Sequence, residues 1–423
     1  MTLNFTTEHP ITTDKDLSSA RFWEQTFEER EKTFRWLREN EPVSWHPPLE
    51  TEDLPPEVHG EKGFWAITLA EDITRVSQNH EDFSSERGDV TLRPLYQFQR
   101  DQAPTFLIMD PPRHTAYRRI ISAAFTPKGV ARLNSQIVER AGEIVGRVVG
   151  AGDIDFVREV SAKLPMLTIA DMVGVPESLI HAFAEAGDNW ISIGDAEVRT
   201  PGVSVEEFAM QQLAAIQQIG VETVNLRRAH PADDLATALA QAELNGRRLS
   251  DDDIGAMMLL LSVAGNDTTK QTTTRTVVAL DRNRDQRAWL TEDFDSRIGA
   301  SIEEFIRHAC PVIEFARTAT HDTELRGVPI SEGDKVAMFY CSGNRDESIF
   351  PDSGKFDLSR PRTPHVGFGG GGIHFCLGNG VAKAQLRALF NEILTKLAHI
   401  EVGEPENLNS EFINGVKRLP VRV

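Results

Sequence analysis

The clearest hydrophobic pattern in the chain is a long, almost wholly apolar stretch that follows a helix-start signal. Ser250 precedes Asp251–Asp253, and a serine cap followed by acids in the first turn is typical of a helix N-terminus. The sequence then continues to about Leu280 without a proline, and its centre is apolar on all sides. A helix that is apolar all round is buried. The pattern therefore predicts a helix that crosses the middle of one large domain, residues 1–423.

The remaining patterns describe further helices and a few short strands. Apolar positions between Ala382 and Leu397 recur at the spacing of one helix face. Short runs rich in aromatic and β-branched residues predict strands at Gly63–Thr68, Lys335–Phe339 and Val416–Val423. The expected fold class is mainly α with small β-sheets.

The charge balance narrows the class of partner. The chain carries 64 acidic and 45 basic residues, a formal net charge of −19, which disfavours nucleic acid or an anionic membrane as the main partner. The longest uncharged apolar stretch, Ile254–Gly265, is shorter than the ~20 residues that span a bilayer. The first residues have neither a basic start nor an apolar core. We expect a cytoplasmic protein with no membrane anchor.

An unusual glycine-rich stretch, GFGGGGIHFCLG, extends from Gly367 to Gly378. Three interpretations compete for it: a loop that cradles phosphate, a metal site, or a loop that presents one thiolate. The three cysteines of the chain are widely spaced and contain no CxxC pair, which argues against a disulfide framework or a structural zinc site. They are Cys310, Cys341 and Cys376.

The phosphate interpretation fails on context. Gly367, Gly369 and Gly372 satisfy G-x-G-x-x-G, and Glu392 follows about twenty residues later. A dinucleotide-binding unit needs a strand, a helix and a second strand that ends at the acid, whereas Glu392 lies inside one continuous predicted helix. The dinucleotide interpretation is rejected.

The thiolate interpretation fits better. Cys376 stands just before a predicted helix, where outward-pointing N–H groups and the helix dipole stabilise a thiolate. The glycines permit positive φ and allow a large flat ligand to approach the backbone closely. A single cysteine is a known axial ligand of haem iron. We expect Cys310 and Cys341 to be buried, inert thiols.

This stretch resembles the haem-binding loop of the cytochrome P-450 superfamily, F-x-x-G-x-[RH]-x-C-x-G. The resemblance implies that Cys376 is the axial thiolate of a haem b, that His374 contacts a haem propionate, and that Gly372 and Gly378 are the required glycines. Phe368 stands eight residues before the cysteine rather than seven, so one glycine is inserted. The same variant occurs in relatives that oxidise sterols and methyl-branched lipids.

The long helix carries a second match. Ala264-Gly265-Asn266-Asp267-Thr268-Thr269 resembles the oxygen-activating [AG]-G-x-[DE]-T-[TS] of this superfamily. A small residue at the helix centre leaves room for a diatomic molecule. A threonine hydroxyl that releases its own i−4 carbonyl can hold a water, and the neighbouring acid can relay protons. The resemblance assigns the catalytic roles to Asp267 and Thr268.

Further matches follow in the same order as in the superfamily. Glu304 and Arg307 match E-x-x-R, an i,i+3 pair on one helix face, and the resemblance implies a buried structural pair completed by Arg360. In soluble bacterial members, the residues that correspond to His114, Arg118 and Arg317 contact the haem propionates.

What the resemblance implies is a monooxygenase that uses O₂ and two electrons to hydroxylate an unactivated C–H bond. No flavin or iron–sulfur motif is present, so the electrons are expected from a ferredoxin with an NAD(P)H-dependent reductase. Candidate docking cations are Arg118, Arg119, Lys383 and Arg387. The residues expected to line the substrate pocket are Ala264, Val312, Ile313 and Phe315, with Phe106 and Leu107 nearby.

The apolar pocket favours a hydrophobic substrate, such as a sterol, a terpenoid or a branched fatty acyl chain. Two alternatives stay open at this point. One is a tailoring hydroxylase of natural-product biosynthesis that acts on a macrolide or peptide. The other is a haem protein that binds a ligand without turnover, as a sensor or carrier.

Overall fold

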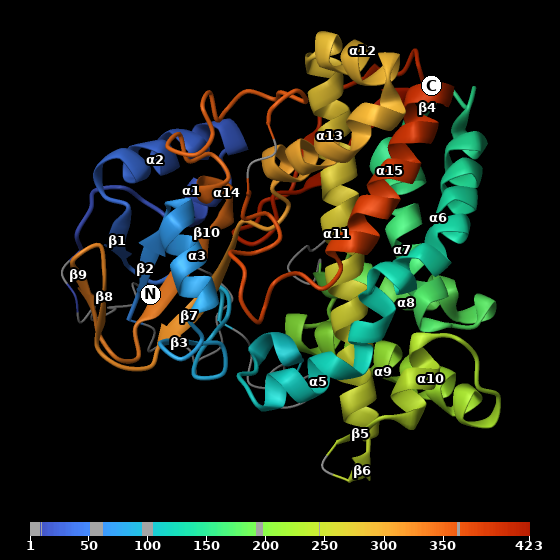
Figure 1. Ribbon diagram of the computed structural model, residues 1–423, viewed down its shortest axis with the longest axis horizontal. Coiled ribbons are helices and arrows are strands. Elements are labelled where there is room, and N and C mark those ends of the chain that lie inside the picture. The colour runs from blue at the N-terminus through green and yellow to red at the C-terminus, as the bar shows by residue number, and fades with distance from the viewer. Residues whose placement is uncertain are drawn as a thin grey trace.

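The computed structural model is a mainly helical molecule with a smaller sheet-containing part at one side (Figure 1). Helices fill the larger part, and a five-stranded sheet with short helices packed around it forms the smaller one. The expected fold class, mainly α with small β-sheets, is therefore confirmed. The structure describes residues 9, 11–50, 62–94, 105–191, 198–244, 246–361 and 364–423.

Local sequence signals set many helix ends. Thr126 accepts a hydrogen bond from the Gly129 N–H at the start of one helix, and Gly174 ends another in a left-handed conformation with φ of 86°. The helices are α1 (Ala20–Trp23), α2 (Phe27–Asn40), α3 (Ala70–Gln78), α5 (Arg113–Ser122), α6 (Pro127–Val148), α7 (Lys163–Val173), α8 (Glu177–Ile191), α9 (Val205–Ala229), α10 (Leu235–Gln241), α11 (Asp251–Arg282), α12 (Arg284–Glu292), α13 (Phe294–Ala309), α14 (Tyr340–Gly343) and α15 (Asn379–Lys396), with single turns at Phe106–Ile108, Ala123–Phe125 and Val157–Ser161.

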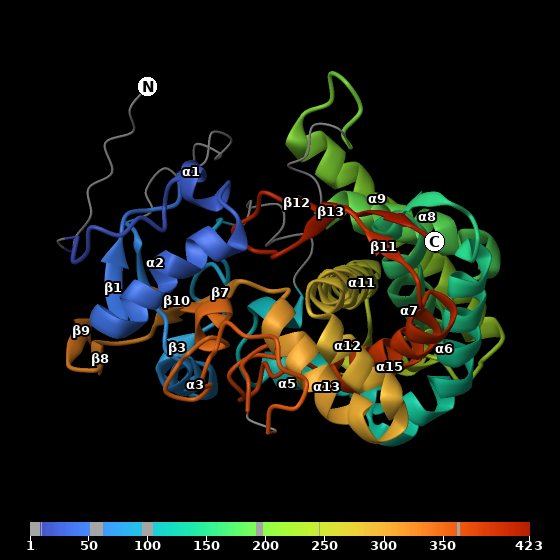
Figure 2. The same ribbon diagram turned by 90° about the horizontal axis from the view of Figure 1, so that it is seen from above.

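Helix α11 occupies the centre of the molecule (Figure 2). The Ser250 side chain accepts a hydrogen bond from the Asp253 N–H, and the Asp253 carboxylate accepts one from the Ser250 N–H, which makes a capping box. Most of the helix is buried, and α7, α8 and α9 lie along it. The predicted central helix is confirmed, and it ends at Arg282, two residues beyond the expected Leu280.

The main sheet has the strand order β1-β2-β10-β7-β3. Strand β10 pairs parallel with β2 and antiparallel with β7, where Val336 faces Arg317. The strands of this sheet are β1 (Val43–His46), β2 (Phe64–Ile67), β3 (Phe83–Ser84), β7 (Glu314–Ala319) and β10 (Lys335–Phe339).

The smaller sheets correct one strand prediction. The segment expected as a single strand, Val416–Val423, forms two strands separated by Leu419, because each strand pairs in a different sheet. The short strands are β4 (Asp153–Asp155), β5 (Glu243–Leu244), β6 (Arg247–Arg248), β8 (Thr323–Leu325), β9 (Val328–Ile330), β11 (Glu401–Val402), β12 (Glu406–Asn407), β13 (Val416–Arg418) and β14 (Pro420–Arg422).

A buried ion network fixes α13 to the loop that precedes the glycine-rich stretch. Arg307 Nε lies 2.7 Å from Glu304 Oε2, and Arg360 Nε lies 3.4 Å from the same oxygen. Arg307 also donates to three backbone carbonyls, so its charge is fully hydrogen-bonded. The expected structural network of Glu304, Arg307 and Arg360 is confirmed. Within the described ranges, no helix combines the length and apolar character needed to cross a bilayer.

Candidate active site

Cys376 lies in a short turn that leads directly into α15. Its N–H donates a hydrogen bond to the carbonyl oxygen of Phe368 over 3.0 Å, and its own carbonyl accepts one from the Asn379 side chain over 2.9 Å. Gly378 is the N-cap of α15. The cysteine therefore stands at a helix N-terminus, as its position in the sequence predicts.

Cys376 differs from the other two cysteines in its surroundings. Burial is the largest influence and raises the pKa of its thiol, but the N–H groups of Gly378 and Asn379 and the positive charge of Arg118 act in the opposite direction. Burial raises the pKa of Cys310 to about 12. Cys376 is partly exposed, whereas Cys310 and Cys341 are buried, so only Cys376 is placed to bind a ligand.

The glycine run lets the loop lie directly against α3. Gly371 and Gly372 have φ of 96° and 73°, and a Cβ on Gly372 would stand 2.5 Å from the Ser77 carbonyl oxygen. The Ser77 hydroxyl donates to the Gly371 carbonyl over 2.9 Å. The close approach that these glycines permit is thus to a helix of the protein itself, in addition to any approach of a flat ligand.

The inserted glycine does not detach Phe368 from the cysteine. The Phe368 ring lies 6.3 Å from the Phe375 ring and 5.8 Å from the His365 ring, measured between centroids. The Lys383 Nζ lies 5.2 Å from the centroid of the same ring. Phe368 therefore remains part of the loop that surrounds Cys376.

Two histidines from distant parts of the sequence meet beside the loop. The rings of His114, on α5, and His374 lie 4.4 Å apart between centroids. The His374 Nε2 lies 3.0 Å from the Ser85 hydroxyl oxygen. His114 is only 2% exposed, and within the described part of the chain neither of its ring nitrogens has a hydrogen-bond partner.

Two arginines complete this group. Arg317 is buried on β7 and donates to the carbonyl of the preceding residue, and Arg118 donates to the Phe375 carbonyl over 2.6 Å. No carboxylate of the described residues pairs with either guanidinium. Burial, followed by the charges of neighbouring cations, lowers the pKa of His114 to about 4 and that of His374 to about 2.

This donor set fits the carboxylates of a haem. Buried hydrogen-bond donors without an acceptor are costly, and buried cations are normally paired with anions. Two propionates placed among His114, Arg118, Arg317 and His374 would satisfy both needs. The sequence motifs that suggested these residues lie far apart in the chain, and the fold brings all four together.

On α11, Ala264 and Thr268 interrupt the buried surface of the central helix. Ala264 is exposed although it lies near the middle of the helix, and Thr268 is half-buried. The Thr268 hydroxyl donates to the Ala264 carbonyl oxygen over 3.0 Å, the i−4 bond that a serine or threonine forms within a helix. These two residues therefore keep exposed surface at the middle of an otherwise mostly buried helix.

Asp267 lies in an ion network that sequence reasoning missed. Its Oδ1 lies 2.7 Å from the Lys270 Nζ, and that same ammonium lies 3.5 Å from Asp188 Oδ1 on α8. The Asp267 Oδ2 is buried without a hydrogen-bond partner among the described residues. The spacing i,i+3 of Asp267 and Lys270 was a usable signal, whereas nothing in the sequence connects Asp188 to them.

The residues expected to line a substrate pocket do not all have the same environment. Val312 and Phe315 are half-buried, and the Phe315 ring lies 5.3 Å from the Phe412 ring. Ile313 is buried in the hydrophobic core beside the main sheet. Phe412, on the loop before β13, is therefore a further aromatic candidate that the sequence did not indicate.

Two of the four candidate docking cations form ion pairs with described carboxylates, and the other two do not. Lys383 Nζ lies 2.7 Å from Glu303 Oε1, and Arg387 pairs with Asp295 over 2.6 Å. Arg119 is exposed, and it forms no ion pair with a residue that the structure describes. Arg118 is half-buried against the cysteine loop.

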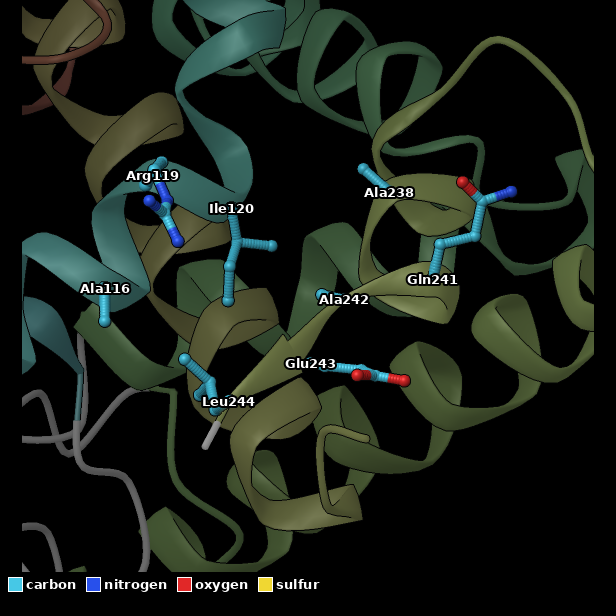
Figure 3. A pocket seen from close by; sticks show the side chains of 8 residues that line it. All are labelled: Ala116, Arg119, Ile120, Ala238, Gln241, Ala242, Glu243 and Leu244. Carbon is cyan, nitrogen blue, oxygen red and sulfur yellow. The ribbon is translucent and has the colours of Figure 1, made fainter. Parts of the chain in front are cut away.

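A hollow of about 240 Å³ lies between α5, α10 and β5 (Figure 3). Arg119 and Ile120 border it on one side, and Gln241 and Glu243 border it on the other (Figure 3). None of its lining residues belongs to the groups around Cys376 or Asp267. We do not assign the substrate to this hollow.

Comparison with known proteins agrees with this geometry. The family model described as cytochrome P-450 matches residues 203–420. A methyl-branched lipid omega-hydroxylase of Mycobacterium tuberculosis is 38% identical over 418 residues, which are 98% of this chain and 95% of that protein. A steroid C26-monooxygenase of Rhodococcus jostii is 34% identical over 419 residues, 97% of this chain and 83% of that protein.

Among solved structures, the chain is similar to a Mycobacterium marinum cytochrome P-450 in complex with pseudoionone. The two superpose with a TM-score of 0.93 and 42% sequence identity, over 98% of this chain and 99% of the other. The sequence and the fold therefore show that the chain belongs to the cytochrome P-450 family of haem-thiolate monooxygenases.

Proposed function

We propose that this monooxygenase hydroxylates an unactivated C–H bond of a hydrophobic small molecule: a sterol, a terpenoid or a branched fatty acyl chain. The observation that carries the substrate class is the similarity, over nearly the whole chain, to proteins named for acting on methyl-branched lipids and steroids. The omega carbon is the end of an acyl chain, so we place the oxidised carbon at or near a chain terminus. A single domain over residues 1–423 and a cytoplasmic location stay predictions from the sequence.

We assign the binding of haem b to the residues around the cysteine loop. Cys376 is the proposed axial ligand, and Phe368 and Gly378 hold the turn that presents it. When bound, the haem supplies the activation of O₂ and the oxidation of the substrate. The propionate partners are the four donors that the fold brings together: His114, Arg118, Arg317 and His374.

Asp267 and Thr268 are the proposed proton-handling residues. The Thr268 hydroxyl can exchange its bond with the Ala264 carbonyl for one with a water molecule. Asp267 Oδ2, which has no hydrogen-bond partner among the described residues, is the oxygen proposed to carry the proton, while Oδ1 is held by Lys270. Asp188, partly exposed on α8, continues this series of titratable groups toward solvent, and burial raises its pKa.

We propose that Ala264, Val312, Ile313 and Phe315 contribute to the substrate pocket, with Phe412 beside them. Ala264, Val312 and Phe315 retain exposed surface, which supports direct contact with substrate. Ile313 lies behind them in the core, where it donates its N–H to the Phe412 carbonyl over 2.8 Å. Its contribution would be to support the pocket wall.

Electrons are proposed to come from a ferredoxin and its NAD(P)H-dependent reductase. Of the four candidate docking cations, Arg119 is the one that is exposed without an ion pair to a described residue. Arg118 lies against the carbonyl of Phe375, which is itself an exposed aromatic residue next to Cys376. An acidic ferredoxin would find the positive charge of Arg118 and the exposed Phe375 ring beside Cys376.

The substrate class is tested by turnover of a panel. The purified protein would be supplied with a ferredoxin, a reductase and NADPH, and offered a methyl-branched fatty acid, a sterol, a terpenoid, a straight-chain fatty acid and a macrolide. We expect a substrate-induced spin-state shift and a hydroxylated product with the branched or steroidal compounds. Preferential oxidation of the macrolide would favour the tailoring alternative, and ligand binding without product would favour a sensor or carrier.

A further inference from the structure

Glu303, the neighbour of the structural Glu304, takes part in a separate network on the cysteine side of α13. Its Oε2 lies 3.0 Å from the His365 Nε2, and its Oε1 lies 2.7 Å from the Lys383 Nζ. The side chains of Glu303, His365 and Lys383 are 18%, 6% and 32% exposed. Three segments, α13, the loop before the glycine run and α15, thus meet at one carboxylate.

The hydrogen bonds of this network define the state of each member. The Gly367 N–H donates to His365 Nδ1 over 3.1 Å, so that nitrogen is unprotonated and Nε2 carries the proton donated to Glu303. The hydrogen bond from His365 lowers the pKa of Glu303 most, burial opposes it, and Lys383 lowers it further, to about 2. Glu303 is therefore negatively charged at neutral pH.

The network reaches Cys376 through two intervening residues, Gly367 and Phe368. Phe368 follows the Gly367 that bonds to His365, and the Phe368 carbonyl accepts the Cys376 N–H over 3.0 Å. The Phe368 ring lies 5.8 Å from the His365 ring, between centroids, and its centroid lies 5.2 Å from the Lys383 ammonium. The Lys383 charge is also one of the influences that lower the pKa of Cys376. A fixed negative charge and a fixed positive charge therefore lie beside the loop.

We propose that Glu303, His365 and Lys383 are positioning residues that set how strongly the Cys376 thiolate donates electrons to the haem iron. Lys383 stabilises the thiolate, and Glu303 offsets part of that positive charge while it holds His365 against the loop. This inference rests on the proposed role of Cys376 as the haem ligand.

Electrostatics gives the sign of the contribution that each charge makes to the midpoint potential of the haem iron. Reduction of the iron adds one negative charge, so a nearby cation favours the reduced state and a nearby anion favours the oxidised state. Loss of the Glu303 charge therefore raises the midpoint potential of the iron, and loss of the Lys383 charge lowers it. Loss of both charges leaves it nearly unchanged, since the two contributions oppose each other.

The test measures the midpoint potential of the holoprotein, without substrate or ferredoxin, in Glu303→Gln, Lys383→Gln and the double variant. At a redox-buffer potential that reduces half of the wild-type iron, we expect Glu303→Gln to be mostly reduced and Lys383→Gln mostly oxidised. The double variant is expected to stay close to half reduced. Lys383→Arg, which keeps the charge, should retain most of the wild-type behaviour.

A matched control lies on the same two helices. Arg387 and Asp295 join α15 to α13 one turn farther along α15, and their neutral variants Arg387→Gln and Asp295→Asn should leave the potential close to the wild-type value. Shifts of the same sign in Glu303→Gln and Lys383→Gln would overturn the proposal, because loosening of the loop would move both potentials in one direction. Unchanged potentials in both would overturn it as well.

Failure of the proposed function would be seen separately. If Cys376 were not the ligand, the reduced, CO-bound wild-type protein would lack the red-shifted thiolate Soret band before any variant was made. If that band is present and the two potentials do not move in opposite directions, only the role of the network is wrong.

Discussion

The N–H of Cys376 donates a hydrogen bond to the Phe368 carbonyl over 3.0 Å, although one glycine more than the usual family spacing separates them. The extra residue is accommodated because consecutive glycines can adopt positive φ while the loop lies against α3. The Cys376 N–H thus has an acceptor in the Phe368 carbonyl, and the glycines between the two residues lie against α3.

The buried position of Arg317 leads to a prediction about the rate at which the protein loses haem. Replacing it by leucine removes a buried, charged hydrogen-bond donor from the proposed propionate site, and such a bond contributes about 1.5–3 kcal/mol. We expect Arg317→Leu to release haem to excess apomyoglobin about tenfold faster or more. Arg119→Leu, a change at an exposed arginine of α5, should leave the rate unchanged. Equal rates for wild type and Arg317→Leu would place the propionates elsewhere.

The ion pairs of Lys270 lead to a prediction about how efficiently protons are delivered during turnover. Lys270→Met leaves the Asp267 and Asp188 carboxylates without the cation that they share, so Asp267 Oδ1 loses its ion pair. We expect the product formed per NADPH consumed to fall about tenfold, less than the roughly 10²–10⁴-fold that a general acid or base itself contributes, and the solvent isotope effect to rise. Lys270→Arg should recover part of the loss.

Thr268 and Thr272 lie on the same helix, so a comparison of their alanine variants tests whether the role of Thr268 is specific. Both hydroxyls donate to the carbonyl four residues earlier, but Thr272 is buried. Thr268→Ala should uncouple NADPH consumption from product formation, and Thr272→Ala should not. Uncoupling of equal size in both variants would contradict a specific role for Thr268.

The burial of Glu314 leads us to expect that the stability of the folded protein depends on pH. It is fully buried on β7, where Oε1 accepts the Leu92 N–H over 3.0 Å and Oε2 has no partner among the described residues. Burial is the main influence and raises its pKa from 4.5 to about 8. An acid with a raised pKa binds more protons in the folded state than in the unfolded state. Its presence therefore lowers the free energy of unfolding as pH rises between these values.

Glu314→Gln should remove this dependence. The variant is expected to match wild type near pH 5 and to be more stable by about 2 kcal/mol or more near pH 8.5, as judged by thermal denaturation. Glu324→Gln, at an exposed position of β8, is the control for loss of a charge. Parallel pH profiles of Glu314→Gln and wild type would show that the Glu314 carboxyl is not protonated in the folded protein.

The exposed charge of Arg119 leads to a prediction about the rate at which a ferredoxin reduces the haem iron. Arg119→Glu reverses an exposed charge that forms no ion pair with a described residue, so we expect slower reduction of the iron by the ferredoxin, most clearly at low ionic strength. Substrate affinity should not change. Arg147→Glu, at an exposed arginine of α6, serves as the control. Unchanged reduction kinetics in Arg119→Glu would remove this surface from the docking site.

Local signals in the sequence were sufficient for part of the fold. The serine cap and apolar run of α11 define a helix without reference to the rest of the chain, and the i,i+3 spacing of Glu304 and Arg307 defines their pairing. The division of Val416–Val423 into β13 and β14 was missed because it depends on two different partner strands. Strand pairing over long sequence separations leaves little trace in a single segment.

The same distinction holds in the site. Motifs identified Cys376, Asp267 and the donors around the cysteine loop, but nothing in a single sequence shows that Asp188 shares the ammonium of Lys270. The Glu303–His365 contact joins residues 62 positions apart. Such contacts depend on how helices and loops pack, so they appear only once the structure is known.

The proposed role of Cys376 is tested most directly by the absorption spectrum of the purified, reduced and CO-bound protein. We predict a strongly red-shifted Soret band, the signature of a thiolate ligand to haem iron. Absence of that band from haem-replete, undenatured protein would contradict the assignment of Cys376 as the axial ligand.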